Sequence, residues 1–165
     1  MEETRYEVIP GFYSESQKQR LVEGLSGTEW ERCVTLTTKR DYELPDLIGF
    51  VRDFIRRIDG ITHSRSQYFF GLSGQENLEQ ERTFSTRLHL HGVIAGVGDI
   101  TNEQIEGCWR SVEVRFSPST DLSFTLPNTL GYSKVVHYDG NPDWLFYILN
   151  QTRKGEILTN CGGQV

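Results

Sequence analysis

Long hydrophobic runs are missing from this chain of 165 residues, and none approaches the roughly 18 apolar residues that a membrane-spanning helix requires. The first residues, Met-Glu-Glu-Thr-Arg, lack the basic segment and apolar stretch of a secretory signal peptide. Cysteine is scarce, because only Cys33, Cys108 and Cys161 are present, widely spaced and odd in number. This pattern argues against a disulfide framework and against a zinc site built from cysteine pairs. We therefore expect an intracellular protein with reduced thiols and no membrane partner.

Repeats, low-complexity tracts and proline-rich linkers are also missing. A chain of this length can bury one substantial core, so residues 1–165 are interpreted as a single domain. Positive charge is not in excess, since 17 lysines and arginines stand against 23 aspartates and glutamates, for a net charge of −6. Phosphate affinity comes mainly from lysine and arginine, which argues mildly against a nucleic-acid partner. Several basic residues nevertheless fall in the first half of the chain, a pattern compatible with a small basic groove on an acidic body.

The hydrophobic periodicity predicts an α+β fold. Helices are expected where apolar residues recur every three or four positions, and strands where β-branched or alternating apolar residues occur. The second and third strands are joined by a short polar loop, which favours a hairpin and a largely antiparallel sheet. The second helix is expected to end at Gly60, and Asp99 or Thr101 to cap the third. The predicted helices cover residues 15–25, 46–58, 102–109 and 142–153, and the predicted strands 30–37, 67–72, 83–95, 111–116 and 134–138.

Two histidines one residue apart stand out in the third predicted strand, in the apolar run His89-Leu90-His91-Gly92-Val93. Side chains two residues apart in a strand point to the same face, so both imidazoles can bind one divalent ion. An isolated His-x-His pair in a strand is more often an ordinary pair of half-buried residues. The metal-binding interpretation therefore needs further support from the rest of the chain.

The last predicted helix supplies a candidate nucleophile. Trp144, Tyr147 and Gln151 recur at helical spacing and share one face. If this face packs on the sheet, Tyr147 projects toward the histidine strand, where its oxygen could attack a metal-bound phosphate. Tyr132 and Tyr138 are the competing tyrosines, and both are expected in or beside a strand. The alternative role of Tyr147 is simple core packing.

Three short motifs, in this order, resemble the HUH endonucleases of the rolling-circle replication-initiator (Rep) type. His89-Leu90-His91 is similar to their His-hydrophobic-His motif, and Val34-Thr35-Leu36-Thr37 resembles their first motif. Tyr147 resembles the catalytic tyrosine of the third motif, and Trp109 matches a tryptophan that follows the histidine strand in many members. The likeness covers about residues 30–155.

This resemblance implies a ferredoxin-like or RRM-like antiparallel sheet, with the histidines on a central strand. It implies Mg²⁺- or Mn²⁺-dependent nicking of single-stranded origin DNA, in which Tyr147 becomes linked to the 5′ phosphate and a free 3′ hydroxyl is left for rolling-circle synthesis. No helicase domain follows, so a separate helicase and polymerase are expected as partners. The residues expected to contact DNA are Thr35, Thr37, Lys39, Arg40, Arg87 and Lys154.

The chain departs from the family at two points. The lysine that often follows the catalytic tyrosine by one helical turn is replaced by Asn150 and Gln151, and Lys154 lies two turns on. The identity of the third metal ligand stays open between two kinds of residue. An acid in the loop between the second and third strands, or the glutamine of the last helix, matches a ligand used by members of the HUH family. The candidates are Glu76 and Gln151, with Glu79 and Glu81 as further acids of the loop.

Two alternatives stay open. Gln151 resembles the glutamine of single-tyrosine HUH transposases, which commonly act as dimers in which the tyrosine helix of one subunit serves the other, so the oligomeric state would separate them from initiators. In the second alternative, the domain is a non-catalytic RRM-like module that stacks bases of a single strand on exposed aromatics such as Phe69 or Phe84. Stacking needs no ion, so metal dependence distinguishes it from the nuclease.

Overall fold

The computed structural model describes residues 14–39, 42–73, 89–113, 130–152 and 157–161. Within these ranges the chain forms the predicted α+β fold, with a five-stranded antiparallel sheet in the order β4-β1-β3-β2-β5 and four helices. Across the same residues, no helix combines the length and apolar character needed to cross a membrane. The elements are α1 (Glu15–Leu25), β1 (Arg32–Thr37), α2 (Leu44–Thr62), β2 (Gln67–Ser73), β3 (His89–Ala95), α3 (Asn102–Arg110), β4 (Ser133–His137), α4 (Asp143–Gln151) and β5 (Ile157–Thr159).

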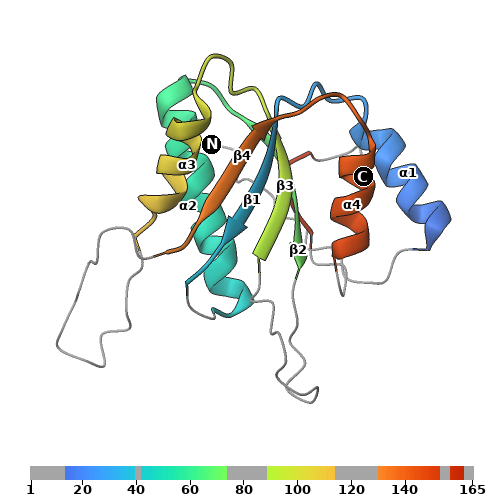
Figure 1. The fold of residues 1–165 in the computed structure, drawn as a ribbon, viewed down its shortest axis with the longest axis horizontal. Helices are drawn as coiled ribbons and strands as arrows, with labels where there is room; N and C mark the ends of the chain where they lie inside the picture. Colours follow the sequence, from blue (N-terminus) through green and yellow to red (C-terminus); the bar gives the residue numbers. More distant parts are fainter. Residues whose placement is uncertain (1–13, 40–41, 74–88, 114–129, 153–156, 162–165) are drawn as a thin grey trace.

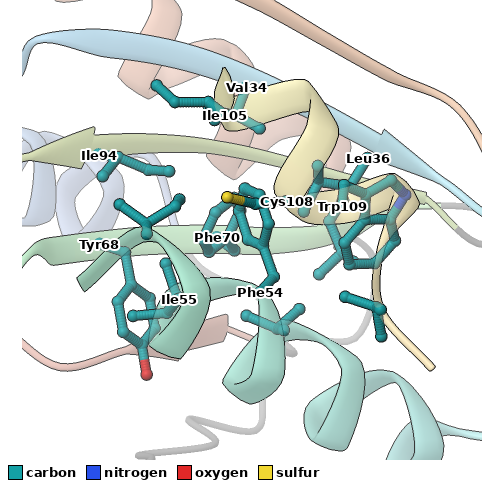
Figure 2. Packing of buried hydrophobic residues seen from close by; sticks show 14 of the residues in the cluster. Val34, Leu36, Phe54, Ile55, Tyr68, Phe70, Ile94, Ile105, Cys108 and Trp109 are labelled. Atoms are coloured by element: carbon teal, nitrogen blue, oxygen red, sulfur yellow. The ribbon is translucent and has the colours of Figure 1, made fainter. Parts of the chain in front are cut away.

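Helices cover both faces of the sheet, α2 and α3 on one side and α1 and α4 on the other (Figure 1). The larger core lies between the sheet and α2 and α3, where Phe54 and Trp109 meet edge to face with ring centroids 5.6 Å apart (Figure 2). The indole N–H of Trp109 also donates to the carbonyl of Thr37 at 3.0 Å, which ties α3 to the end of β1. On the opposite face, Phe69 and Val93 belong to a second core with residues of α1 and α4.

Capping residues explain where two helices begin. Ser14 and Gln17 form a capping box at α1, and Thr101 and Gln104 form one at α3. In each box the hydroxyl accepts a backbone N–H of the first turn and the glutamine side chain returns to the cap, so two unpaired backbone donors are satisfied. Of the two caps that the sequence left open for α3, Thr101 is therefore the one used.

The predicted end of α2 at Gly60 is wrong, because the helix continues to Thr62. Glycine in a helix costs only about 1 kcal/mol relative to alanine and does not by itself end it. The helix ends where His63 takes a left-handed backbone conformation, at φ 53°. Asp59 fixes the next segment, since its carboxylate accepts the backbone N–H and the hydroxyl of Ser66 at 2.9 and 2.6 Å.

Two strand predictions also need correction. The strand expected over residues 111–116 is not present in its described part, because residues 111–113 are irregular and Ser111 caps the end of α3. Val112 is buried in the core, so its apolar character reflects one packing position rather than a pleated strand. The structure adds a strand that the sequence did not predict, β5, which pairs with β2.

The topology determines where α4 lies. β4 and β5 form opposite edges of the sheet, and α4 is the helix that joins them in sequence. A chain that leaves one edge and returns at the other must cross the face of the sheet. α4 accordingly packs on β2 and on the central strand β3. This crossing brings the middle of the helix to the strand that carries the two histidines.

Candidate metal and nucleophile site

His89 and His91 point to the same face of the central strand, the face covered by α4. Their ring centroids are 4.7 Å apart and the ring planes are perpendicular. His91 is buried, with 8% of its surface exposed, and His89 is half-buried. The pair therefore offers two nitrogen donors at the edge of a buried region, as the alternation of the strand predicted.

Thr35 on β1 orients one of these rings. It is the register partner of His91 across the β1–β3 ladder, and its Oγ1 lies 3.2 Å from Nδ1 of His91. When Nδ1 carries the proton and donates it to the hydroxyl, the lone pair of Nε2 is left for a metal ion. Contacts of this kind fix the tautomer of a ligand histidine and the direction of its ring.

Burial, together with the charge on neighbouring His89, lowers the pKa of His91 from 6.5 to about 4. Removing the ring from water disfavours its charged form, and a second imidazolium nearby disfavours it further. His91 is thus neutral at physiological pH. A neutral imidazole is the form that binds a metal ion.

Tyr147 lies directly beside His91, with ring centroids 5.1 Å apart and an interplanar angle of 72°. Its other neighbour is Trp144, one turn earlier on α4, which stacks on it at 5.1 Å and 18°. The indole N–H of Trp144 donates to the carbonyl of Gly92 at 3.2 Å and so attaches α4 to the histidine strand. Tyr147 still has 40% of its surface exposed. The two rings restrain the phenol without covering it.

The last turn of α4 lies next to His89. Ser73 on β2 is the register partner of His89, and its hydroxyl donates to the backbone carbonyl of Gln151 at 3.0 Å. The side chain of Gln151 is exposed. The backbone of Gln151 therefore contacts the residue paired with His89, one strand away from the histidine pair. The alternative ligands Glu76, Glu79 and Glu81 lie outside the described residues.

The donor set fits a divalent ion in part. Among the described residues no group of three or more histidine, cysteine, aspartate or glutamate side chains is arranged to hold a metal. His89 and His91 supply two ligands, and Gln151, water or a phosphate oxygen would have to supply the others. Nitrogen donors suit a transition ion such as Mn²⁺ better than Mg²⁺, which takes oxygen ligands.

The residues predicted to contact DNA are brought together only in part. Thr35 and Thr37 are the β1 partners of His91 and His89, and Lys39 follows on the same side, with its ammonium 5.3 Å from the ring centroid of Tyr132. The remaining candidates, Arg40, Arg87 and Lys154, lie outside the described residues.

The competing tyrosines lie farther from the histidines. Tyr138 is at the opposite end of β1, where its N–H donates to the carbonyl of Glu31, and burial raises the pKa of its phenol. Tyr132 lies beside Thr37 and is 71% exposed. Phe69, proposed as an exposed stacking residue, is fully buried under α4, so that prediction is wrong. Phe84 lies outside the described residues.

One contact close to the site was missed from the sequence. Asn150, about one helical turn after Tyr147, accepts a hydrogen bond of 2.9 Å from Nζ of Lys18 on α1. The same ammonium lies 3.1 Å from the carboxylate of Glu15, so the contact joins α1 to α4. Lys18 and Asn150 are 132 apart in sequence, and no local pattern connects them.

Comparison with models of protein families, with curated proteins and with solved structures finds no significant match to this chain.

Proposed function

We propose that this chain is a metal-dependent, single-stranded DNA endonuclease of the HUH replication-initiator type. The observation that carries the proposal is the contact between Tyr147 and His91. A half-exposed phenol packs against the imidazole of His91, which is neutral, contacts Thr35 and has His89 beside it. A tyrosine that only filled the core would be buried, as Tyr68 is.

In the proposed reaction the phenol oxygen of Tyr147 attacks the scissile phosphorus and gives up its proton to solvent. A tyrosine–phosphate ester bond forms and the bond from phosphorus to the 3′ oxygen breaks. The departing 3′ oxygen takes up a proton and becomes a free hydroxyl. His89 and His91 would hold the ion, which would polarise the phosphate and offset the charge that develops in the transition state. Trp144 orients the nucleophile by stacking on it.

The phosphotyrosine bond keeps the energy of the broken phosphodiester, so the step is reversible and allows later rejoining. We infer rolling-circle replication as the setting, with single-stranded origin DNA as substrate and a helicase and polymerase supplied separately. The three cysteines are free and buried, which is in keeping with an intracellular protein. The oligomeric state in solution would distinguish the initiator from a transposase dimer that exchanges its tyrosine helices.

The test is a denaturing gel after incubation of the full chain with a randomised single-stranded DNA pool and Mn²⁺. We expect a covalent protein–DNA adduct that disappears with EDTA and in Tyr147→Phe. Sequencing of the linked strand would identify the target. His89→Gln and His91→Gln should each abolish the adduct while the protein remains folded.

Matched controls come from the other tyrosines. Tyr132→Phe and Tyr138→Phe remove a hydroxyl of the same kind elsewhere in the chain and should leave the adduct intact. If the adduct still forms in Tyr147→Phe but is lost in one of these variants, the nucleophile is the tyrosine replaced in that variant. DNA binding that is equal in Mn²⁺ and EDTA, with no adduct, would overturn the nuclease and favour the non-catalytic single-strand binder.

A further inference from the structure

Among the described elements, no helix covers one part of the sheet. α1 and α4 lie over β2, β3 and the start of β1, where Cys33, Phe69 and Val93 are buried. On β4 only Val135 is buried, and it points to the opposite face, toward the core with α2 and α3. The β4 side chains on the α4 side of the sheet are therefore exposed.

Large apolar side chains gather on this uncovered side. Four are exposed in the described part of the chain. Tyr132, Val136 and Tyr147 lie on the α4 side of the sheet, with 71%, 44% and 40% of their surfaces exposed. The fourth, Ile61, is at the end of α2 on the other side. Exposed apolar residues scattered singly need no explanation, but a cluster beside a candidate site points to a ligand.

Lysines flank the most exposed of these rings. Lys134 is the register partner of Thr35, and Lys39 places its ammonium 5.3 Å from the centroid of Tyr132. Thr37 joins this group, because its N–H donates to the carbonyl of Tyr132 at 2.8 Å and its hydroxyl accepts the N–H of Tyr132 at 3.2 Å. We name Thr37, Lys39, Tyr132 and Lys134 the Tyr132 platform.

The platform lies close to the candidate site. Thr37 and Thr35 on β1 are paired with His89 and His91 on β3, so the platform begins one strand away from the imidazoles. β4 is the next strand out, and adjacent strands are about 4.8 Å apart, which places Tyr132 and Lys134 on the order of 10 Å from β3.

The chemistry of the platform favours a single strand of nucleic acid. An exposed aromatic face stacks on a nucleobase, and neighbouring ammonium groups pair with phosphates. None of the four side chains is acidic, although the whole chain has a net charge of −6. The carboxylate of Glu106, which accepts the N–H of Val135 at 3.1 Å, reaches β4 from α3, on the opposite face of the sheet. A duplex keeps its bases stacked on one another and cannot offer a face to Tyr132.

We propose that the Tyr132 platform binds the single strand beside the scissile phosphate, with a base stacked on Tyr132 and flanking phosphates paired with Lys39 and Lys134. Lys39 lies over one face of the ring, and the base would stack on the other. This inference rests on the proposed function and adds the path of the DNA, from the imidazole pair across β1 to β4.

The test measures binding apart from cleavage, by fluorescence anisotropy of a labelled 15-residue oligothymidylate with the full chain in EDTA. Tyr132→Ser should weaken binding about 5- to 150-fold, the range expected for loss of one stacked base. Tyr132→Phe keeps the ring and should bind within about twofold of the parent, by the same stacking argument. Lys39→Gln and Lys134→Gln should each reduce the salt slope by about 0.7. Ile61→Ser, an exposed apolar residue on the other side, is the control that leaves binding unchanged.

Each outcome separates the platform from the nuclease. Unchanged binding in Tyr132→Ser, together with a normal covalent adduct, would overturn the platform and leave the proposed function standing. Weakened binding in Tyr132→Ser, with no adduct in the parent, would support the platform and overturn the nuclease. Equal affinity for a 15-base-pair duplex would overturn stacking. A dimer of the parent that Tyr132→Ser converts to monomer would show that a second copy, rather than DNA, covers this surface.

Discussion

Thr35 and His91 face each other across the β1–β3 ladder, with the threonine Oγ1 3.2 Å from Nδ1 of the imidazole. The first motif and the histidine motif are therefore one structural unit. If Nδ1 donates its proton to this hydroxyl, Nε2 is the ring atom left for the proposed metal ion, and Thr35 would then orient a metal ligand as well as favour a strand.

Replacing Thr35 with valine should weaken binding of Mn²⁺ by about 10- to 100-fold, the usual effect of losing a partner of a ligand histidine. Valine keeps the β-branched shape and removes only the hydroxyl, so the strand should be preserved. Isothermal titration with Mn²⁺ measures the effect, and Thr35→Ser is the matched control that should restore affinity. Unaltered affinity in Thr35→Val would show that the hydroxyl does not act on the metal site.

Trp144 should affect the rate of adduct formation rather than DNA affinity. It stacks on Tyr147 and attaches α4 to the carbonyl of Gly92, so Trp144→Leu frees the phenol to leave its position. Loss of orientation of this kind costs about tenfold or more in rate. Single-turnover adduct formation measures the rate, and anisotropy in EDTA measures affinity. Trp144→Phe retains an aromatic face and should recover part of the rate; an equal loss of affinity and rate would point to a DNA contact instead.

The low pKa of His91 predicts a pH-dependent stability of the metal-free protein. The folded state holds this pKa near 4, while the unfolded chain has its ordinary value near 6.5. Between these values the unfolded state binds more protons, so the free energy of unfolding falls as the pH falls from about 6.5 toward 4. The contribution of this group from pH 7 to pH 5 is about 2 kcal/mol.

Urea denaturation in EDTA at both pH values tests this dependence, with His91→Gln as comparison. Carboxylates titrate in both proteins, so the difference between them isolates the imidazole. Parallel losses of stability in the two proteins would contradict the prediction.

Gly92 should not tolerate a larger residue. A Cβ there would overlap the ring of Phe70 and approach the carbonyl of Phe69 to 2.7 Å. Since the neighbouring strand cannot move freely, Gly92→Ala should destabilise the protein by about 1–3 kcal/mol. Gly60→Ala in α2 is the matched control, because nothing lies within 4 Å of its Cβ. This control should gain up to about 1 kcal/mol. Thermal unfolding measures the stability of both variants. An equal loss of stability in Gly92→Ala and Gly60→Ala would contradict the packing explanation.

The sequence predicted elements whose signals are local. Each predicted helix is present because its apolar positions repeat at the helical spacing, and Thr101 caps α3 as one of two candidates. β5 has three residues, too few for a period to be read, and it forms because β2 offers a free edge. The prediction that α2 ends at Gly60 gave too much weight to glycine, since the helix ends where the backbone of His63 becomes left-handed.

In the candidate site, too, local sequence patterns predict some features and tertiary contacts determine the others. Two residues of a strand, His89 and His91, share a face by geometry alone. The contacts of Thr35 with His91 and of Lys18 with Asn150 depend on sheet register and helix packing between distant segments. Phe69 was misjudged because alternation does not reveal whether one or both faces of a sheet are covered. Here the described helices cover both faces in the middle of the sheet and leave the side chains of β4 on the α4 side exposed.

The crossing of α4 between the two edges of the sheet has a mechanical consequence. Strand pairing anchors the chain on both sides of the helix, through β4 before it and β5 after it. The helix that carries Tyr147 is therefore held at both ends by the sheet on which it packs. Under the proposed function, a DNA strand joined to Tyr147 would be tethered above the centre of the sheet. The three residues of β5 thus help to hold α4, and with it Tyr147, over the strand that carries the histidines.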